Sequence, residues 1–125
     1  MSKTDELKVL VVDDTKLGRL SAKKILNGMG LVQITECASG EEVLDLLKKQ
    51  KIDLILMDIL MPGIGGIDLL KAIRKDNRET RILMVSADIQ DTTRTICLES
   101  GADGFINKPV SDQKLRPVLE EIGVL

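Results

Sequence analysis

The stretch Leu54-Ile55-Leu56-Met57-Asp58 is a run of four apolar residues that ends on a carboxylate. The same pattern occurs at residues 9–14, Val-Leu-Val-Val-Asp-Asp, and at residues 82–86, Ile-Leu-Met-Val-Ser. A shorter run at residues 104–107, Gly-Phe-Ile-Asn, leads into Lys108-Pro109. Short apolar runs bounded by turn residues are typical of strands buried in a parallel sheet. These four segments therefore predict strands of an α/β domain.

The segments between these runs show helical periodicity. Ala22, Ile25, Leu26 and Met29 lie on one face of a helix that begins after Asp14. Further helices are expected behind the other strands. A capping box of Ser39 and Glu42 marks the start of the second helix, and Asp88 and Ser111 mark the starts of the fourth and fifth. The residues expected on the buried faces are Val43 in the second helix, Leu69, Leu70 and Ile73 in the third, Ile89, Thr93 and Ile96 in the fourth, and Leu115, Val118, Leu119 and Ile122 in the fifth.

Two further features complete the predicted fold. Residues 31–36 alternate apolar Val32 and Ile34 with Gln33 and Thr35, which predicts an edge strand. Pro117 lies inside the last helix, where a proline costs about 3 kcal/mol, so we expect a kink or a late helix start. Five strands alternating with five helices predict a doubly wound α/β domain, although the pattern does not fix the strand order.

The polar residues at the strand ends predict one site. Ligands of open α/β sheets bind beyond the carboxyl ends of the strands, so Asp13, Asp14, Asp58, Ser86 and Lys108 should gather in a single cleft. Three crowded carboxylates cannot all stay ionised unless a cation joins them or one keeps its proton. Mg²⁺, a hard cation that takes oxygen ligands and often shares a phosphate, would balance them together with the lysine. The pattern therefore predicts a site for a divalent cation and a phosphoryl group.

Composition narrows the possible functions. At 125 residues, 43% hydrophobic and 30% charged, the chain is expected to form one globular domain over residues 1–125. A formal net charge of −2 argues against a nucleic-acid-binding surface. No signal sequence or membrane-length apolar run is visible, so we expect a cytoplasmic protein without membrane contact. Cys37 and Cys97 are expected to be free thiols, with Cys97 on the core side of a helix. The lack of histidine excludes catalytic triads, imidazole zinc sites and phosphohistidine carriers.

Several motifs together resemble one family. Asp13-Asp14, Asp58 followed by Met61-Pro62-Gly63, Ser86-Ala87 and Lys108-Pro109 have the order and spacing of the receiver domain of bacterial two-component response regulators. The chain is similar to this family over nearly its whole length. The resemblance implies a five-stranded parallel sheet of flavodoxin-like order 2-1-3-4-5.

The resemblance also implies roles for individual residues. Asp58 would be the phosphoacceptor, and Asp13, Asp14, Asp58 and the backbone carbonyl of Leu60 would hold Mg²⁺ or Mn²⁺. Ser86 and Lys108 would contact the phosphoryl group, with a cis peptide bond between Lys108 and Pro109. Ser86 and Phe105 would be the switch residues, and Leu60 and Asp88 would tune the lifetime of the phosphorylated state. Three positions depart from the usual family pattern: Ser86 stands where threonine is commoner, Phe105 where tyrosine is common, and Gly65 where the family often has a polar residue.

In such a protein the implied function is a phosphorylation-dependent signalling switch, not an enzyme with a separate substrate. A histidine kinase or histidine phosphotransfer protein would donate the phosphoryl group, and the protein would hydrolyse its own acyl phosphate. A downstream protein target would bind the helices predicted over residues 88–100 and 111–122 and the strand that carries Phe105. The sequence leaves open whether this is a stand-alone receiver or a domain excised from a larger regulator or hybrid kinase.

Three other classes of protein fit parts of the pattern. A phosphatase with an aspartyl nucleophile usually has a second Asp two residues later as general acid, but Leu60 cannot donate a proton. A nucleotide-binding module would need a glycine loop, and the cluster at residues 63–66 lacks the required spacing. An unphosphorylated scaffold of the same fold is disfavoured by the intact Asp58 and Lys108, and a phosphorylation assay would decide it.

Overall fold

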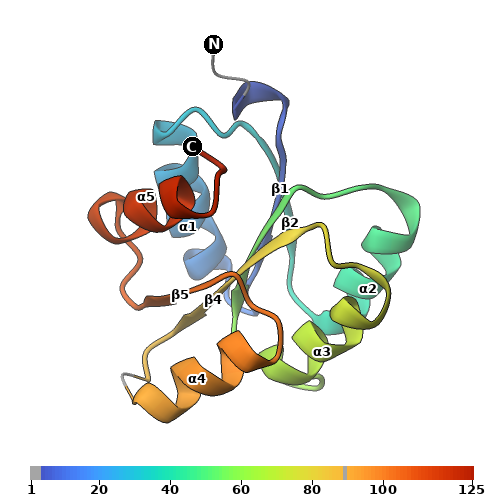
Figure 1. The fold of residues 1–125 in the computed structure, drawn as a ribbon. Helices are drawn as coiled ribbons and strands as arrows, with labels where there is room; N and C mark the ends of the chain where they lie inside the picture. The colour runs from blue at the N-terminus through green and yellow to red at the C-terminus, as the bar shows by residue number, and fades with distance from the viewer. Residues whose placement is uncertain (1–3, 89) are drawn as a thin grey trace.

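The computed structural model describes residues 4–88 and 90–125. In this part of the chain, five strands alternate with five α-helices (Figure 1). The strands are β1 (Lys8–Val12), β2 (Gln33–Cys37), β3 (Leu54–Asp58), β4 (Arg81–Ser86) and β5 (Gly104–Asn107). The α-helices are α1 (Lys16–Gly28), α2 (Gly40–Lys49), α3 (Gly66–Asp76), α4 (Asp91–Glu99) and α5 (Asp112–Glu121), and a short 3-10 helix, η1 (Thr4–Glu6), precedes β1. None of these helices is long and apolar enough to cross a membrane, as far as the described residues extend.

The strands form one parallel sheet in the order β2-β1-β3-β4-β5. This confirms the doubly wound α/β fold and the flavodoxin-like strand order. Val12 lies opposite Met57, Asp58 opposite Val85 and Ser86 opposite Asn107. Because all strands run the same way in this register, their carboxyl ends meet at one edge of the sheet.

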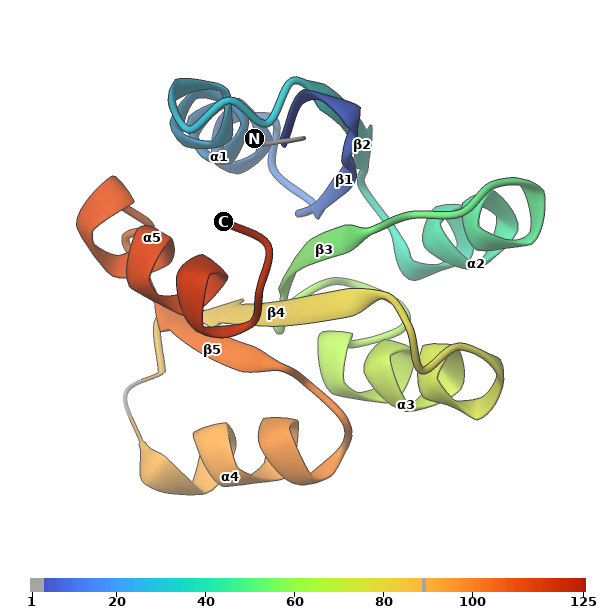
Figure 2. The same ribbon diagram turned by 45° about the horizontal axis from the view of Figure 1, so that its top comes forward.

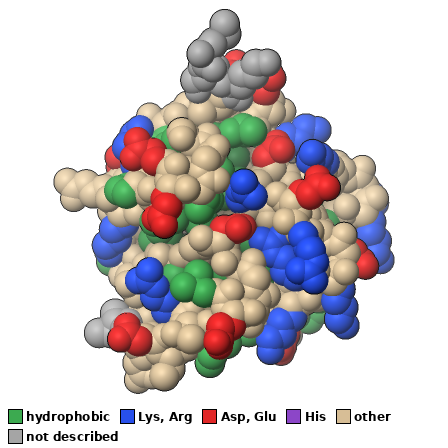
Figure 3. All heavy atoms as spheres, viewed as in Figure 1, with side chains coloured by type: hydrophobic (Ala, Val, Ile, Leu, Met, Phe, Trp, Pro, Cys, Tyr) green, Lys and Arg blue, Asp and Glu red, His purple; other side chains and the backbone are tan. Residues whose placement is uncertain are grey.

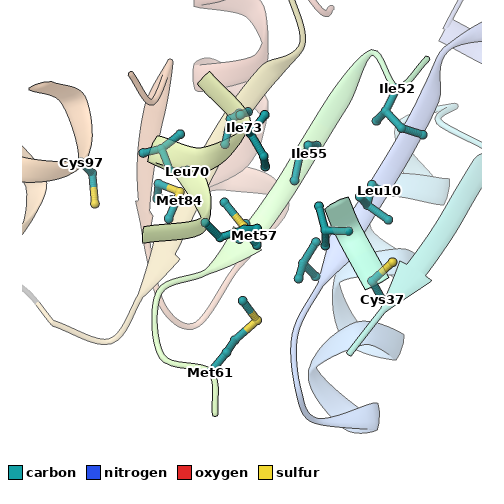
Figure 4. Packing of buried hydrophobic residues seen from close by; sticks show 14 residues of the cluster. Leu10, Cys37, Ile52, Ile55, Met57, Met61, Leu70, Ile73, Met84 and Cys97 are labelled. Carbon is teal, nitrogen blue, oxygen red and sulfur yellow. The ribbon is translucent and has the colours of Figure 1, made fainter. Parts of the chain in front are cut away.

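The helices cover the two faces of the sheet unequally. Helices α1 and α5 pack on one face, and α2, α3 and α4 pack on the other (Figure 2). Successive strand side chains point to opposite faces, so Val11 belongs to the α1–α5 core and Leu10 to the α2–α3–α4 core. In the latter core, Met57 and Met84 lie close to residues of α3 (Figure 4). Burial of both faces explains why the central strands read as continuous apolar runs.

Three helices begin at the hydroxyl residues that capping chemistry favours. The side chains of Thr15, Ser39 and Ser111 each accept a hydrogen bond from a backbone N–H three residues further on. The expected partner of Ser39 is also present, since Oε1 of Glu42 accepts a hydrogen bond from the backbone N–H of Ala38 at 3.1 Å. The predicted capping pair at α2 is therefore confirmed, with its carboxylate bound one residue before the cap.

The edge strand begins at Gln33, two residues later than predicted. Val32 is 56% exposed and lies outside the strand, whereas Leu31 is fully buried. The backbone N–H of Leu31 donates to the carbonyl of Leu26 at 3.1 Å, which ties this residue to the end of α1. Leu31 therefore closes the helix instead of opening the strand.

Helix α4 differs most from its prediction. It begins at Asp91 and not at Asp88, and Ile89 lies outside the described residues. The later start places the buried face on half-buried Thr93 and fully buried Cys97, which are four residues apart. Ile96 is 46% exposed, so the prediction that it faces the core is wrong, while the core-facing position of Cys97 is confirmed.

Pro117 does not delay the last helix. Helix α5 begins at Asp112, directly after its cap Ser111, and continues through Pro117 to Glu121. The proline is exposed, as is Gln113, whose carbonyl loses its helical partner and can be hydrated instead. Fully buried Leu115 and Leu119 hold the helix against the sheet on either side of this position.

Candidate functional site

Four strand ends bring the predicted site residues to one edge of the sheet. Asp13 follows β1, Asp58 is the last residue of β3, Ser86 is the last of β4, and Lys108 follows β5. The side chains of Asp13, Asp58 and Lys108 lie close together. Ser86 lies beside them at the end of the neighbouring strand.

The three carboxylates form a compact cluster. One oxygen atom from each of Asp13, Asp14 and Asp58 lies within 4.8 Å of the others. Asp13 and Asp58 are 8% and 6% exposed, whereas Asp14 is exposed. Carboxylate oxygens at this spacing are the ligands that a hard divalent cation prefers. The residues present therefore fit such a cation.

Asp58 also has a cationic partner. Oδ2 of Asp58 lies 2.6 Å from Nζ of Lys108, and Oδ1 accepts a hydrogen bond from the backbone N–H of Leu60 at 3.1 Å. Burial by itself lowers the pKa of Lys108. The hydrogen bond to Asp58 and the charges of Asp58, Asp13 and Asp14 together outweigh it, so the pKa of this lysine is raised above its ordinary value. The ammonium group is therefore charged at neutral pH and faces the carboxylates.

Asp13 is held in place by the start of α1, through a residue that the sequence analysis did not identify. Oδ1 of Asp13 accepts hydrogen bonds from both the backbone N–H and Oγ1 of Thr15, each at 2.9 Å. Oγ1 of Thr15 also accepts from the backbone N–H of Gly18 at 3.2 Å. A threonine directly before a predicted helix is a favoured N-cap, so this signal was present in the sequence.

Gly18 makes room for this arrangement. A Cβ atom at position 18 would overlap the carboxylate of Asp13 and lie 2.7 Å from Oγ1 of Thr15. A second close approach occurs at Gly66, where a Cβ atom would lie 2.7 Å from Cα of Ile59. Both glycines thus let a helix start pass tightly beside a strand end that carries a site carboxylate.

Arg19 links the site to the edge strand. Its Nη1 donates to the backbone carbonyl of Asp13 at 2.8 Å, and its Nε lies 3.1 Å from Oε1 of Glu36 in β2. Neither the sequence spacing nor the motifs indicated this contact, because Arg19 and Glu36 are 17 positions apart. The backbone on which Asp13 sits is therefore fixed from two sides.

Ser86 is buried and already hydrogen-bonded. Its Oγ accepts a hydrogen bond from the backbone N–H of Asp88 at 2.9 Å. The carboxylate of Asp88 accepts in turn from Oγ1 of Thr93 at 2.6 Å and from the backbone N–H of Gln90 at 2.9 Å. These two bonds lower the pKa of Asp88, the one from Thr93 more strongly. Asp88 thus organises the turn that leads into α4.

Phe105 lies in β5, away from the carboxylate cluster. Its ring is half-buried and packs against the core under α2, α3 and α4, and its backbone pairs with Met84. The peptide bond between Lys108 and Pro109 is cis, the geometry that the resemblance implied. Strand β4 lies between the strand that carries Phe105 and the strand that ends at Asp58.

A cavity of about 450 Å³ opens beside the carboxylates, between α1 and the loop after β5. Leu56 and Val85 from the sheet and Ala22 from α1 form part of its apolar wall. Asp58 and Lys108 also line it. Asp58 therefore borders this cavity, although little of its side chain is exposed.

Comparisons with known proteins agree with this geometry. The model of the response regulator receiver domain family matches residues 9–120. The chain is 33% identical over 118 residues to the chemotaxis protein CheY of Pseudomonas aeruginosa, a match that covers 93% of this chain and 95% of that protein. It is 34% identical to the osmosensing histidine protein kinase SLN1 of Saccharomyces cerevisiae, where the match covers 92% of this chain but 10% of the kinase.

A solved structure shows the same fold. A high-resolution structure of the chemotaxis response regulator CheY4 of Vibrio cholerae superposes with a TM-score of 0.84 at 30% sequence identity, and covers 95% of this chain and 98% of that one. The strand order and the family match therefore lead to the same conclusion. The chain belongs to the response regulator receiver domains, the signalling switches of two-component systems.

Proposed function

We propose that Asp58 accepts a phosphoryl group from the phosphohistidine of a histidine kinase or of a histidine phosphotransfer protein. A carboxylate oxygen of Asp58 attacks the phosphorus atom, the P–N bond to the donor imidazole breaks, and the imidazole nitrogen keeps the bonding pair. The observation that supports this most directly is the 2.6 Å contact between Lys108 and Asp58, within a cluster of carboxylates. A positive charge this close to Asp58 would stabilise the equatorial oxygens of a transferred phosphoryl group.

Asp13, Asp14, Asp58 and the backbone carbonyl of Leu60 would hold Mg²⁺, or Mn²⁺ in its place. The bound cation would neutralise charge on the phosphoryl oxygens and on the crowded carboxylates. The chain's own residues supply the rest of the chemistry. The backbone N–H of Thr15 orients Asp13 by a hydrogen bond. The Lys108 ammonium, which contacts Asp58, would donate hydrogen bonds to the phosphoryl oxygens.

Signalling would follow from a change in Ser86. In the phosphorylated protein its hydroxyl would turn from the N–H of Asp88 toward the phosphoryl group, and the Phe105 ring would move into the space that this vacates. The surface of α4, β5 and α5 would then bind a downstream protein target. A ligand shifts such an equilibrium only by its differential affinity for the two states, so the new hydroxyl contact is the source of the response.

The phosphorylated state would end by hydrolysis of the protein's own acyl phosphate. In this proposal the protein is a switch that works in the cytoplasm and not an enzyme acting on a separate substrate. It does not bind nucleic acid directly. The same chemistry would operate whether this receiver acts alone, as the match to CheY suggests, or within a larger protein, as the match to SLN1 suggests.

Intact mass spectrometry tests the proposal. Wild type, Asp58→Ala and the control Asp45→Ala, an exposed carboxylate on α2, are incubated with acetyl phosphate with Mg²⁺ and with a chelator. We expect one phosphoryl adduct on wild type and on Asp45→Ala, only with the cation. An adduct on Asp58→Ala, or one that forms equally in the presence of chelator, would contradict the proposal.

A further inference from the structure

A second recess lies between α2 and α3. It has a volume of about 590 Å³ and runs along the C-terminal halves of the two helices and the loop before β4. We call it the α2–α3 groove. Its floor is apolar and contains half-buried Leu44, Leu47 and Ala72 together with buried Ile73. The two helices lie side by side on their face of the sheet (Figures 1 and 2).

The rim of the α2–α3 groove carries an excess of positive charge. Lys48, Lys49, Lys51 and Arg78 line it and are all exposed. Figure 3 shows blue side chains gathered on the right of the molecule, where α2 and α3 lie in Figure 1. This local sign is opposite to the formal net charge of the chain, which is −2.

Helix electrostatics explain only part of this rim. Lys48 and Lys49 stand in the last turn of α2, where cations favour the helix dipole. Lys51 and Arg78 lie outside the helices and approach the groove from two different loops. Two carboxylates, Asp76 and Glu79, also line the groove, so its four cations leave a local excess of two positive charges. The contact of Glu79 with Lys51 is long, 3.9 Å, and joins two side chains that are 75% and 85% exposed. Such a pair is worth little, so the rim is free to bind another anion.

The wall of the groove next to β4 is rigid. Nη1 of Arg74 donates to the carbonyls of Asn77 and Thr80, at 3.1 and 2.8 Å. Oδ1 of Asn77 accepts from the backbone N–H groups of Glu79 and Thr80, at 3.0 and 3.1 Å. A wall that is already ordered costs little conformational entropy when a ligand binds.

We propose that the α2–α3 groove binds an acidic segment of a partner protein, an amphipathic helix whose apolar side chains enter the groove and whose carboxylates meet Lys48, Lys49, Lys51 and Arg78. An apolar floor between cationic rims suits a helix that carries apolar anchors flanked by acidic residues. Nucleic acid fits this groove less well, because the only aromatic residue of the chain, Phe105, does not line it. The floor is also recessed and half-buried, whereas a membrane-binding surface presents apolar side chains outward.

This surface is separate from the phosphorylation proposed above. The groove lies toward the edge of the sheet where strands begin, since Thr80 lines it and donates its hydroxyl to the carbonyl of Ile52, just before β3. Asp58 lies at the opposite end of that strand. Binding at the groove therefore does not depend on whether Asp58 is a phosphoacceptor.

Fluorescence anisotropy tests the proposal with a labelled helical peptide that has leucines on one face and glutamates on the other. We expect saturable binding to wild type and to Asp58→Ala, and weaker binding as ionic strength rises. The double variant Lys48→Glu, Arg78→Glu should bind at least about tenfold more weakly, equivalent to roughly 1.4 kcal/mol. The control Lys16→Glu, Lys24→Glu makes the same change of net charge on α1 and should bind like wild type.

Other outcomes would overturn the proposal. Equal loss of binding in the α1 control would show that only the overall charge matters. If a peptide whose leucines are replaced by serines binds as tightly as the leucine peptide, the apolar floor of the groove does not contribute to binding. Tighter binding of oligothymidylate, or of phosphatidylserine vesicles, through the same Lys48 and Arg78 would assign the groove to another class of partner. If wild type self-associates and the Lys48→Glu, Arg78→Glu variant does not, the groove binds a second copy of this chain and not an acidic partner.

Discussion

Nζ of Lys108 lies 2.6 Å from Oδ2 of Asp58, although the two residues are 50 positions apart in the chain. The lysine side chain is 37% exposed and the carboxylate 8%. An ion pair with one partner this buried is costly to break, because the remaining charge loses its compensation. The contact therefore has consequences for both the stability and the chemistry of the site.

Replacing Lys108 with methionine should slow phosphorylation of Asp58 by acetyl phosphate about a hundredfold, because one of the charges that stabilise the transferred phosphoryl group is lost. The time course of the mass adduct measures this. Lys114→Met is the matched control, since Nζ of Lys114 contacts the carbonyls of Asn107 and Pro109 but not Asp58. A Lys108→Met protein that is phosphorylated as fast as this control would contradict the role of the ammonium.

Gly18→Ala should weaken the binding of divalent cations, because the added Cβ overlaps the Asp13 carboxylate. A cation at one hundred times its Kd stabilises a protein by about 2.7 kcal/mol, and in the variant this gain should be much smaller. Thermal unfolding with and without Mg²⁺ measures it. Gly28→Ala is the control from the same helix, where a Cβ meets nothing within 4 Å, and should keep the full response to the cation. The same gain in both variants would show that Asp13 is not a ligand.

Ser86→Ala should still be phosphorylated but should respond weakly. The lost contact is one charge-assisted hydrogen bond between the hydroxyl and the phosphoryl group, worth about 1.5–3 kcal/mol. Such a bond changes the ratio of the two conformations, with Ser86 and Phe105 before and after their proposed movement, roughly tenfold to a hundredfold. Amide chemical shifts around Phe105, recorded before and after phosphorylation, measure the response. Ser86→Thr keeps the hydroxyl and should respond like wild type. If the shifts in Ser86→Ala are as large as in wild type, the proposed coupling between Ser86 and Phe105 does not exist.

Leu60→Asn should shorten the lifetime of the phosphorylated protein about two- to tenfold, the effect of one hydrogen bond to the attacking water. Leu60 is 75% exposed and follows Asp58 by two residues, so its apolar side chain can shield the acyl phosphate. Asp88 is less able to orient that water, because its carboxylate already accepts hydrogen bonds from Thr93 and Gln90. Loss of the mass adduct after removal of the donor measures the rate, with Leu60→Met as control. Slower loss in the asparagine variant would show that Leu60 does not protect the phosphoryl group.

Cys37 should destabilise the fold at alkaline pH. Burial, reinforced by the charge of Glu42 and opposed by Arg19, raises the pKa of Cys37 from 9.0 to about 11. The folded state therefore holds the thiol proton more tightly than the unfolded state, so this contribution to stability is complete below pH 9 and is lost as the pH rises through about 11. The difference in unfolding free energy between wild type and Cys37→Ala should shrink over this range. A difference that stays constant between pH 8 and pH 11 would contradict the prediction.

Apolar runs and helical periodicity were enough to predict the class of fold, although not the order of the strands. The runs that end at Asp58 and Ser86 are buried on both faces, and the helices α1, α2 and α3 bury the residues that their periodicity marked. These features are local: side chains repeat every two residues in a strand and every 3.6 in a helix, so the chain itself records which face is apolar. The gathering of Asp13, Asp58 and Lys108 followed from the same information, because parallel strands end at one edge.

Tertiary packing alone decided the details of the site and of α4. Arg19 reaches Asp13 and Glu36 together only because α1 crosses beside β2, and no periodicity encodes that distance. Ile96 was predicted to be buried, but the turn that Asp88 organises delays the start of α4 to Asp91, and Ile96 is 46% exposed. The α2–α3 groove likewise exists only where two helices from separate segments meet. Each of these features depends on side-chain contacts between distant parts of the chain, which a one-dimensional pattern does not specify.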